Sequence, residues 1–167
     1  MPGIARRPVW IAAACLIVAI VGYALWPRDA ARIETLLKDS LSQLNRARDP
    51  ASMAELQQFL RATLLPTATV RIAELDLELA GVDAISSRAT ELLAGPPLKF
   101  GWIGLEAKVS GRLATVDADL VVAVRGGAEQ RPQLRRTRVR LAKRGELWQI
   151  EAVEVDAVAL SEPEARP

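Results

Sequence analysis

An apolar run near the N-terminus constrains the structure of this chain more than any other feature of its sequence. The residues from Val9 to Trp26, VWIAAACLIVAIVGYALW, carry no charge. As an α-helix rising about 1.5 Å per residue, the run would extend roughly 27 Å, close to the thickness of the hydrocarbon core of a bilayer. Trp10 at one end, and Tyr23 and Trp26 at the other, occupy the interfacial positions that aromatic side chains prefer. The run therefore predicts a single membrane-spanning signal anchor in contact with the lipid bilayer.

The charges on either side of this run predict its orientation. Arg6 and Arg7 precede it, whereas Arg28 and Arg32, which follow it, are offset by neighbouring acidic residues. Because basic residues are retained on the cytoplasmic side, we expect residues 1–8 in the cytoplasm and the remainder outside it. The arginine-rich, alanine-rich composition indicates a bacterial source, so the expected location is the inner membrane with a periplasmic or extracellular domain. A cleaved signal peptide and a buried soluble helix remain alternatives.

Composition limits the chemistry that the rest of the chain can perform. The 167 residues include 22 basic and 20 acidic side chains, and a net charge of +2 is not the concentrated excess of a nucleic-acid-binding protein. There is no histidine, which removes the commonest general base and the commonest metal ligand. Cys15 is the only cysteine, so an intrachain disulfide and a thiolate metal cluster are excluded. We therefore expect no catalytic residue, no metal, no cofactor and no nucleic-acid partner.

Helical spacing dominates the segment that follows the apolar run. One amphipathic helix is expected to open at Pro27 and Asp29. A second is expected after Asp49, which can cap it, with Pro50 in its first position. The segment GVDAISSRATELLAG predicts a third helix, with Asp83 as its cap. The intervening TVRIAELDLELAG alternates like a strand but changes phase, so we expect one strand with a bulge near its centre.

The final third of the chain predicts long strands, of which the last two form a hairpin. In RRTRVRLAKRGELWQIEAVEV, we place a two-residue turn at Arg144–Gly145. This register puts Leu141 opposite Trp148 on one face of the sheet. On the other face it puts Arg138 opposite Glu151 and Arg140 opposite Gln149. One register thus separates apolar from charged side chains.

The arginines of this hairpin are expected to lie beside acidic residues of the preceding strand. Keeping the valines of GRLATVDADLVVAV on the inner face places Asp117 near Arg140 and Asp119 near Arg138. Such a ladder of opposite charges is either an ordinary solvated face or a surface for a protein partner. Binding to anionic headgroups or nucleic acid is the third alternative. The candidate partner surface consists of Asp117, Asp119, Arg136, Arg138, Arg140 and Glu151.

The order of these elements resembles a known architecture. Two helices, a strand, a helix preceded by Gly81 and a run of long strands ending in GELWQIEAVEV are similar to the NTF2-like (cystatin-like) α+β cone. The resemblance covers roughly residues 29–158 and implies three helices packed on a bent antiparallel sheet. The soluble domain is expected over residues 27–160, with a disordered tail over residues 161–167. Phe100, Trp102 and Trp148 would either line an apolar pocket inside the cone or form part of an ordinary core.

The same superfamily includes ketosteroid isomerase and scytalone dehydratase. Those enzymes use an aspartate with tyrosine donors, or a histidine–aspartate pair. This chain has no histidine, and its only tyrosine, Tyr23, lies in the apolar run. An anchor followed by such a domain also resembles, in layout, an inner-membrane subunit of type IV secretion channels and membrane proteins of actinobacterial lipid-import systems. We therefore expect a non-enzymatic, membrane-tethered interaction or scaffold domain that binds a protein partner or itself. The alternatives are a carrier or sensor of apolar molecules and, last, an isomerase or dehydratase.

Overall fold

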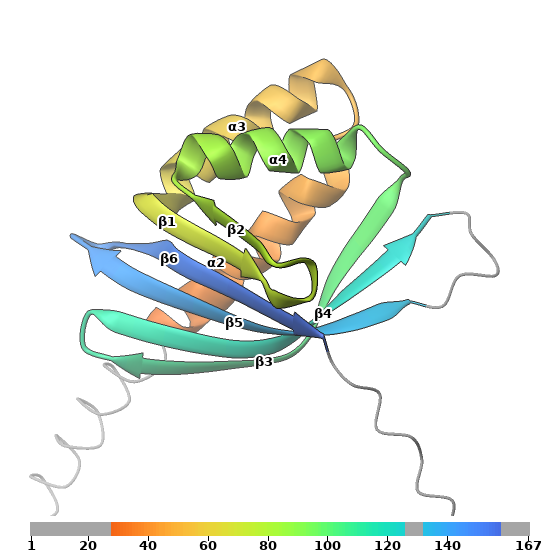
Figure 1. The fold of residues 1–167 in the computed structure, drawn as a ribbon. Helices are drawn as coiled ribbons and strands as arrows, with labels where there is room; N and C mark the ends of the chain where they lie inside the picture. Colours follow the sequence, from red (N-terminus) through yellow and green to blue (C-terminus); the bar gives the residue numbers. More distant parts are fainter. Residues whose placement is uncertain (1–27, 126–131, 158–167) are drawn as a thin grey trace, which may run out of the picture.

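A computed structural model describes residues 28–125 and 132–157 of the chain. The predicted anchor from Val9 to Trp26 and the predicted tail over residues 161–167 lie outside these residues. Within the described ranges, no helix is both long and apolar enough to cross a membrane. The described residues form an α+β fold in which three helices lie against one face of a six-stranded sheet (Figure 1).

The three expected helices are present. They are α2 (Arg28–Arg46), α3 (Pro50–Thr63) and α4 (Val82–Leu93). The expected cap of α3 is confirmed, because the Asp49 side chain accepts hydrogen bonds from the backbone N–H groups of Ala51 and Ser52. The cap expected at Asp83 is wrong, because α4 begins after Gly81 and has no side-chain cap. The positive φ of Gly81, 86°, turns the chain into this helix.

The sheet is mixed, not purely antiparallel as expected. Its strand order is β2-β1-β6-β5-β4-β3, and β1 runs parallel to β6 whereas all other neighbours are antiparallel. β1 follows α3 directly, and the last strand, β6, later runs beside β1 in the same direction. The strands are β1 (Leu64–Ile72), β2 (Leu77–Ala80), β3 (Leu98–Ser110), β4 (Leu113–Val124), β5 (Gln133–Arg144) and β6 (Leu147–Ala157).

The segment expected to form one bulged strand is a small hairpin. A turn of 3-10 helix, η1 (Ala73–Leu75), separates β1 from β2, and Asp76 follows it with a left-handed φ of 47°. The two strands then pair antiparallel, with Ile72 opposite Leu77. The change of phase in the sequence was the correct signal, but it marked a reversal of the chain rather than a bulge. Aspartate is one of the few residues besides glycine that adopts the left-handed conformation at small cost.

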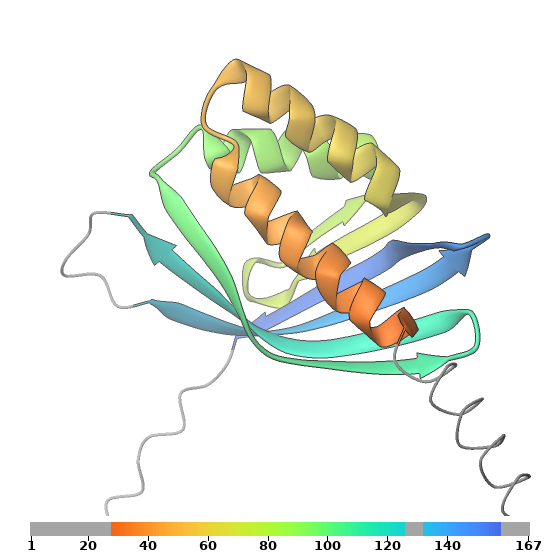
Figure 2. The same cartoon turned by 180° about the vertical axis from the view of Figure 1, so that it is seen from behind.

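The long strands curl around the helices, and the core lies in the space between them (Figures 1 and 2). Ile33 and Leu37 of α2 pack with Val116 of β4 and with Val139 and Leu141 of β5, and all five side chains are fully buried. Buried residues alternate with half-buried ones along the first half of β4 and with exposed ones along the middle of β5. The alternation puts the apolar side chains on the helix-covered face and the charged ones on the opposite, outer face.

The closing hairpin forms as expected, but its register differs. The turn lies at Gly145–Glu146, because Arg144 pairs with Leu147, and Gly145 has a φ of 61°. Leu141 therefore faces Ile150 rather than Trp148. A bulge then shifts the register between Arg140 and Leu141, where β6 carries one extra residue. The predicted opposition of Arg138 and Glu151, and that of Arg140 and Gln149, are both wrong.

Candidate functional site

An apolar cavity of about 220 Å³ lies between the three helices and the inner face of the sheet. Its walls come from α2, α3, α4 and every strand except β2, so no single stretch of sequence defines it. Among the described residues that line it, none is ionisable. They are Leu37, Ser40, Leu41, Leu44, Leu60, Thr63, Leu64, Val70, Ile85, Ala89, Leu92, Phe100, Trp102, Leu120, Thr137, Val139, Ile150, Val153 and Val155.

Three hydroxyl groups line this cavity, and backbone carbonyls accept a hydrogen bond from each of them. Ser40 donates to Leu36 over 2.7 Å, Thr63 donates to Phe59 over 2.8 Å, and the buried Thr137 donates to Arg135 over 3.2 Å. The hydroxyl protons are thus already committed to the fold. The cavity offers a bound molecule mainly apolar contact, which favours hydrocarbon over polar ligands.

Two of the three aromatic residues predicted to line a pocket do so. Phe100 and Trp102, both on β3, lie in the cavity wall. The Trp102 indole N–H donates to the Leu37 carbonyl over 3.1 Å, which satisfies its polar atom and fixes the ring against α2. Asn45 holds the strand in the same place, because its side chain both donates to and accepts from the Phe100 backbone, over 2.9 and 2.8 Å. β3 is thereby joined to α2 along the cavity.

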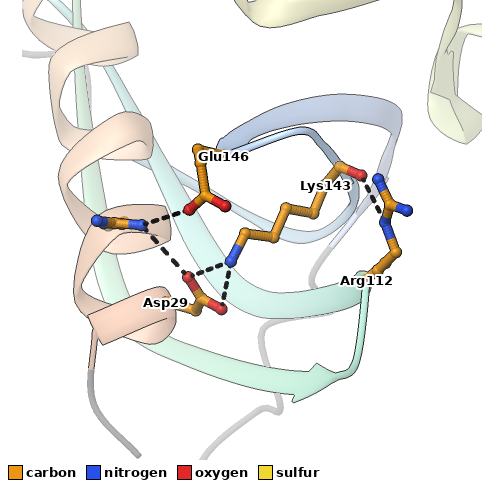
Figure 3. Close-up of polar contacts among 5 residues, drawn as sticks. Asp29, Arg112, Lys143 and Glu146 are labelled. Atoms are coloured by element: carbon orange, nitrogen blue, oxygen red, sulfur yellow. Dashed lines mark hydrogen bonds and ion pairs between the residues drawn. The ribbon is translucent and has the colours of Figure 1, made fainter. Parts of the chain in front are cut away.

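The third aromatic residue, Trp148, is not among the residues that line the cavity. It is buried near the start of α2, and the Lys143 ammonium lies 5.7 Å from the centre of its ring. Lys143 also donates to both carboxylate oxygens of Asp29 over 3.0 Å (Figure 3). The Trp148 indole N–H lies near Asp29 but makes no hydrogen bond with the described atoms. The prediction that Trp148 lines the pocket is wrong, because Trp148 is the second residue of β6 and lies opposite Lys143 at the turn end of the hairpin.

The Lys143 ammonium lowers the pKa of Asp29 from its ordinary value. The hydrogen bonds to Lys143 are the largest cause, and the nearby Trp148 indole and the charge of Arg32 add to the effect. Arg32 lies 3.8 Å from Asp29 and 3.9 Å from Glu146. Asp29 therefore stays ionised and ties the first turn of α2 to the β5–β6 turn.

The outer face of the sheet carries the charged residues predicted as a partner surface, in a different pairing. Asp117 lies opposite Arg138, and Asp119 lies opposite Arg136. Arg138 donates to Asp117 over 2.8 Å, which lowers the pKa of that carboxyl group. The acidic strand beside the arginines is thus as expected, but the register differs by two residues.

Two members of the predicted surface lie apart from this ladder. Arg140 is flanked by Thr115 and Ala152, and its nearest acid is Glu154 at 3.8 Å. Glu151 is exposed at the β6 bulge, outside the paired register. The described helices cover the opposite face of the sheet, so no helix of the described ranges covers the outer face of β4, β5 and β6 (Figure 1).

A wider groove adjoins the cavity. It has a volume of about 510 Å³ and shares Leu41, Phe100 and Trp102 with the cavity wall. Three cations line it, namely Lys38, Arg46 and Arg125, and no acidic residue does so among the described residues. Lys38 is paired with Glu34 over 2.6 Å. Within the described ranges, no cluster of three side chains could hold a metal ion.

Sequence reasoning missed most of the cavity lining. Val70 of β1 and Ala89 of α4 reach the same cavity as Trp102, although the sequence predicted only a strand and a helix there. The apolar periodicity of each element indicates which side chains face inward. It does not indicate where facing elements leave a space, because that depends on the curvature of the sheet.

Comparison with known proteins identifies the fold. No family model and no curated protein sequence matches the chain. A protein of unknown function from Mycobacterium tuberculosis superposes with a TM-score of 0.67 at 15% identity, covering 83% of this chain and 82% of its own. An NTF2-like protein with a cystatin-like fold from Novosphingobium aromaticivorans gives 0.63 at 14% identity, covering 95% and 94%. The expected NTF2-like (cystatin-like) fold is confirmed.

Some structures with this fold carry enzyme names. A candidate ketosteroid isomerase from Parabacteroides distasonis superposes with a TM-score of 0.55 at 15% identity, covering 78% of this chain and 88% of its own. At such identity the likeness extends to the fold alone, because one fold supports many unrelated activities.

Proposed function

We propose that this chain is a membrane-tethered domain that binds an apolar molecule, as a carrier or sensor, without chemically changing it. The observation that supports the proposal is the cavity between the helices and the sheet, whose described lining contains no ionisable side chain. General acid–base catalysis needs a titratable group within hydrogen-bond reach of the substrate. The tether is the charge-free run from Val9 to Trp26.

The size of the cavity limits the ligand. At about 220 Å³ it exceeds the cavity of about 150 Å³ that holds benzene in an engineered protein. It is smaller than the roughly 300–1,000 Å³ of sites for drug-sized molecules. The expected ligand is a short hydrocarbon chain or a small ring system, or the apolar end of a longer molecule. The basic groove beside Phe100 and Trp102 favours a ligand whose polar end is anionic.

A cavity-filling variant tests this proposal. Ala89 on α4 lines the cavity, and Ala89→Leu adds three carbon atoms to a helix position that leucine tolerates well. The full chain in lipid nanodiscs is titrated with toluene by calorimetry. We expect saturable binding to the wild type and an affinity about tenfold lower for Ala89→Leu, from the lost hydrocarbon contact. Because toluene also enters lipid, the difference between the two chains measures the cavity.

The matched control is Ala84→Leu, which makes the same change at an exposed position of the same helix. It should bind toluene as the wild type does. Equal binding to wild type and Ala89→Leu would refute the proposal. Native mass spectrometry of the full chain taken from its own membranes then identifies the natural ligand.

The open outer face of β4, β5 and β6 favours a second candidate function, an interaction or scaffold domain for a protein partner or a second copy. Arg136, Arg138 and Arg140 are exposed on it, and no described helix covers it. A photo-crosslinking amino acid at Arg136 in native membranes should capture one recurrent protein. Capture at the same level from Glu55, which is exposed on α3 on the helix-covered side of the sheet, would count against a specific surface.

A further inference from the structure

Three segments that are distant in sequence meet at one end of the molecule, here called the tip. The tip consists of the β3–β4 turn (residues 109–113), the β5–β6 turn (residues 143–147) and the first turn of α2 (residues 28–32). The two turns are joined by backbone hydrogen bonding from Lys143 to the Arg112 carbonyl over 2.8 Å. The Arg112 side chain returns a bond to the Lys143 carbonyl, and Lys143 binds Asp29 of α2 (Figure 3). These contacts make the tip one rigid surface.

Large apolar side chains are exposed at this tip. Leu147 is 70% exposed, Leu113 is 59% exposed and Val109 is 40% exposed. Leu113 and Leu147 lie outside the core because their neighbours Ala114 and Trp148 point inward and are buried. Burying such side chains in an apolar surrounding is favourable by roughly 25 cal/mol per Å². A cluster at the end of two hairpins is therefore a candidate interaction surface.

The same tip carries a surplus of positive charge. Its basic residues are Arg28, Arg32, Arg112, Lys143 and Arg144, and its acidic residues are Asp29 and Glu146. The acidic residues are engaged by Lys143 and Arg32, which leaves Arg28, Arg112 and Arg144 with no acidic partner among the described residues. Exposed leucines among unpaired arginines are the combination that favours an anionic lipid surface.

The course of the chain before α2 indicates that a lipid surface covers the tip. The charge-free run ends at Trp26, and α2 begins at Arg28. Two residues extend the chain by at most about 7 Å. If the run spans a bilayer, the first turn of α2 must lie at the lipid headgroups, and the rigid tip lies there with it. We propose that the tip rests on the membrane surface, with Leu113 and Leu147 inserted among anionic lipid headgroups. This inference rests on the proposed membrane tether.

Site-specific fluorescence tests the contact. The full chain carrying Cys15→Ser and Leu147→Cys is labelled with an environment-sensitive fluorophore and reconstituted into vesicles of phosphatidylcholine with phosphatidylglycerol. We expect a blue-shifted emission and quenching by lipids that carry a shallow nitroxide. The matched control is Leu75→Cys on the same background, because Leu75 is 65% exposed and follows the end of β1 that lies beside Val155, away from the β5–β6 turn. The label there should behave as it does in water.

Charge reversal tests the role of the arginines. Arg112→Glu with Arg144→Glu should reduce the quenching at position 147, because each basic charge removed lowers the equilibrium constant for contact with an anionic surface by roughly fivefold. Vesicles of phosphatidylcholine alone should give the same loss.

The outcomes separate the tip from the tether. A label at the native Cys15 should be quenched by deep nitroxide lipids if the run spans the bilayer. Deep quenching at position 15 together with equal, water-like emission at positions 147 and 75 would overturn the tip contact and leave the tether standing. Absence of deep quenching at position 15 would overturn the tether itself.

Discussion

Asp29 and Lys143 are 114 positions apart in the sequence and form one of the contacts that hold α2 on the sheet. The carboxylate accepts two hydrogen bonds from the ammonium group, and both side chains are mostly buried. The Trp148 ring shields the pair on one side, since Lys143 lies over its face. A pair with this geometry and limited exposure contributes more than the ion pairs on the open surface of the molecule.

The first prediction concerns this pair. Lys143→Met keeps the apolar part of the side chain but removes the ammonium group, so the Asp29 carboxylate loses its main hydrogen-bond donor. We expect the free energy of unfolding at neutral pH to fall by about 1–2 kcal/mol. Urea unfolding of the full chain measures it. Arg144→Met, one residue further along the same strand, lies on the exposed surface and should change stability by less than about 0.5 kcal/mol.

At the scale of elements, the β5–β6 hairpin shows why the alternation of apolar and charged residues predicted a hairpin correctly but assigned the wrong cross-strand partners. The turn needs a left-handed residue, and Gly145 supplies it with a φ of 61° in the first turn position. The bulge near Glu151 then reverses which side chains of β6 face inward. Trp148 and Ile150 face the core before it, whereas Val153 and Val155 line the cavity after it. In the sequence, the apolar residues Val153 and Val155 of EAVEV are out of phase with Trp148 and Ile150, and this change of phase indicates the reversal.

A second prediction follows from the turn. Gly145→Ala places a Cβ on a left-handed residue, which costs roughly 1–2 kcal/mol. Open space surrounds the position, so the loss should come from backbone strain alone. Gly101→Ala is the control, because a Cβ there also meets open space and its φ is not positive. Equal thermal unfolding temperatures for the two variants would contradict this description of the turn.

For the whole molecule, three carboxyl groups, those of Asp29, Asp49 and Asp117, have lowered pKa values, and two of them join separate elements of the fold. The pKa of Asp29 is lowered by Lys143 and joins α2 to the sheet, and the pKa of Asp117 is lowered by Arg138 and joins β4 to β5. The unfolded chain holds more protons than the folded chain between the lowered values and the ordinary value of 3.8. Stability therefore rises with pH across that window and is fully present above it.

The third prediction is an acid-sensitive unfolding profile. The stabilisation from both pairs should be complete above about pH 5 and should be lost as the pH falls through the lowered values. Asp29→Asn with Asp117→Asn should be less stable at neutral pH and should change less between pH 5 and pH 2. Denaturant unfolding at each pH measures the profile. Asp39→Asn, at an exposed position of α2, should retain the wild-type slope.

The sequence alone determined the type and order of most elements, because amphipathic periodicity, the Asp49 cap and the turn residues act locally. It also determined that the outer face of the sheet is charged and that β3 contributes aromatic side chains to the interior. Register depends on a bulge and on a one-residue shift of a turn, which cost little locally and are decided by packing across the whole sheet. The parallel β1–β6 pair, the cavity and the Asp29–Lys143 contact exist only once distant elements meet. Their positions follow from the curvature of the sheet around the helices, and only the tertiary structure decides that curvature.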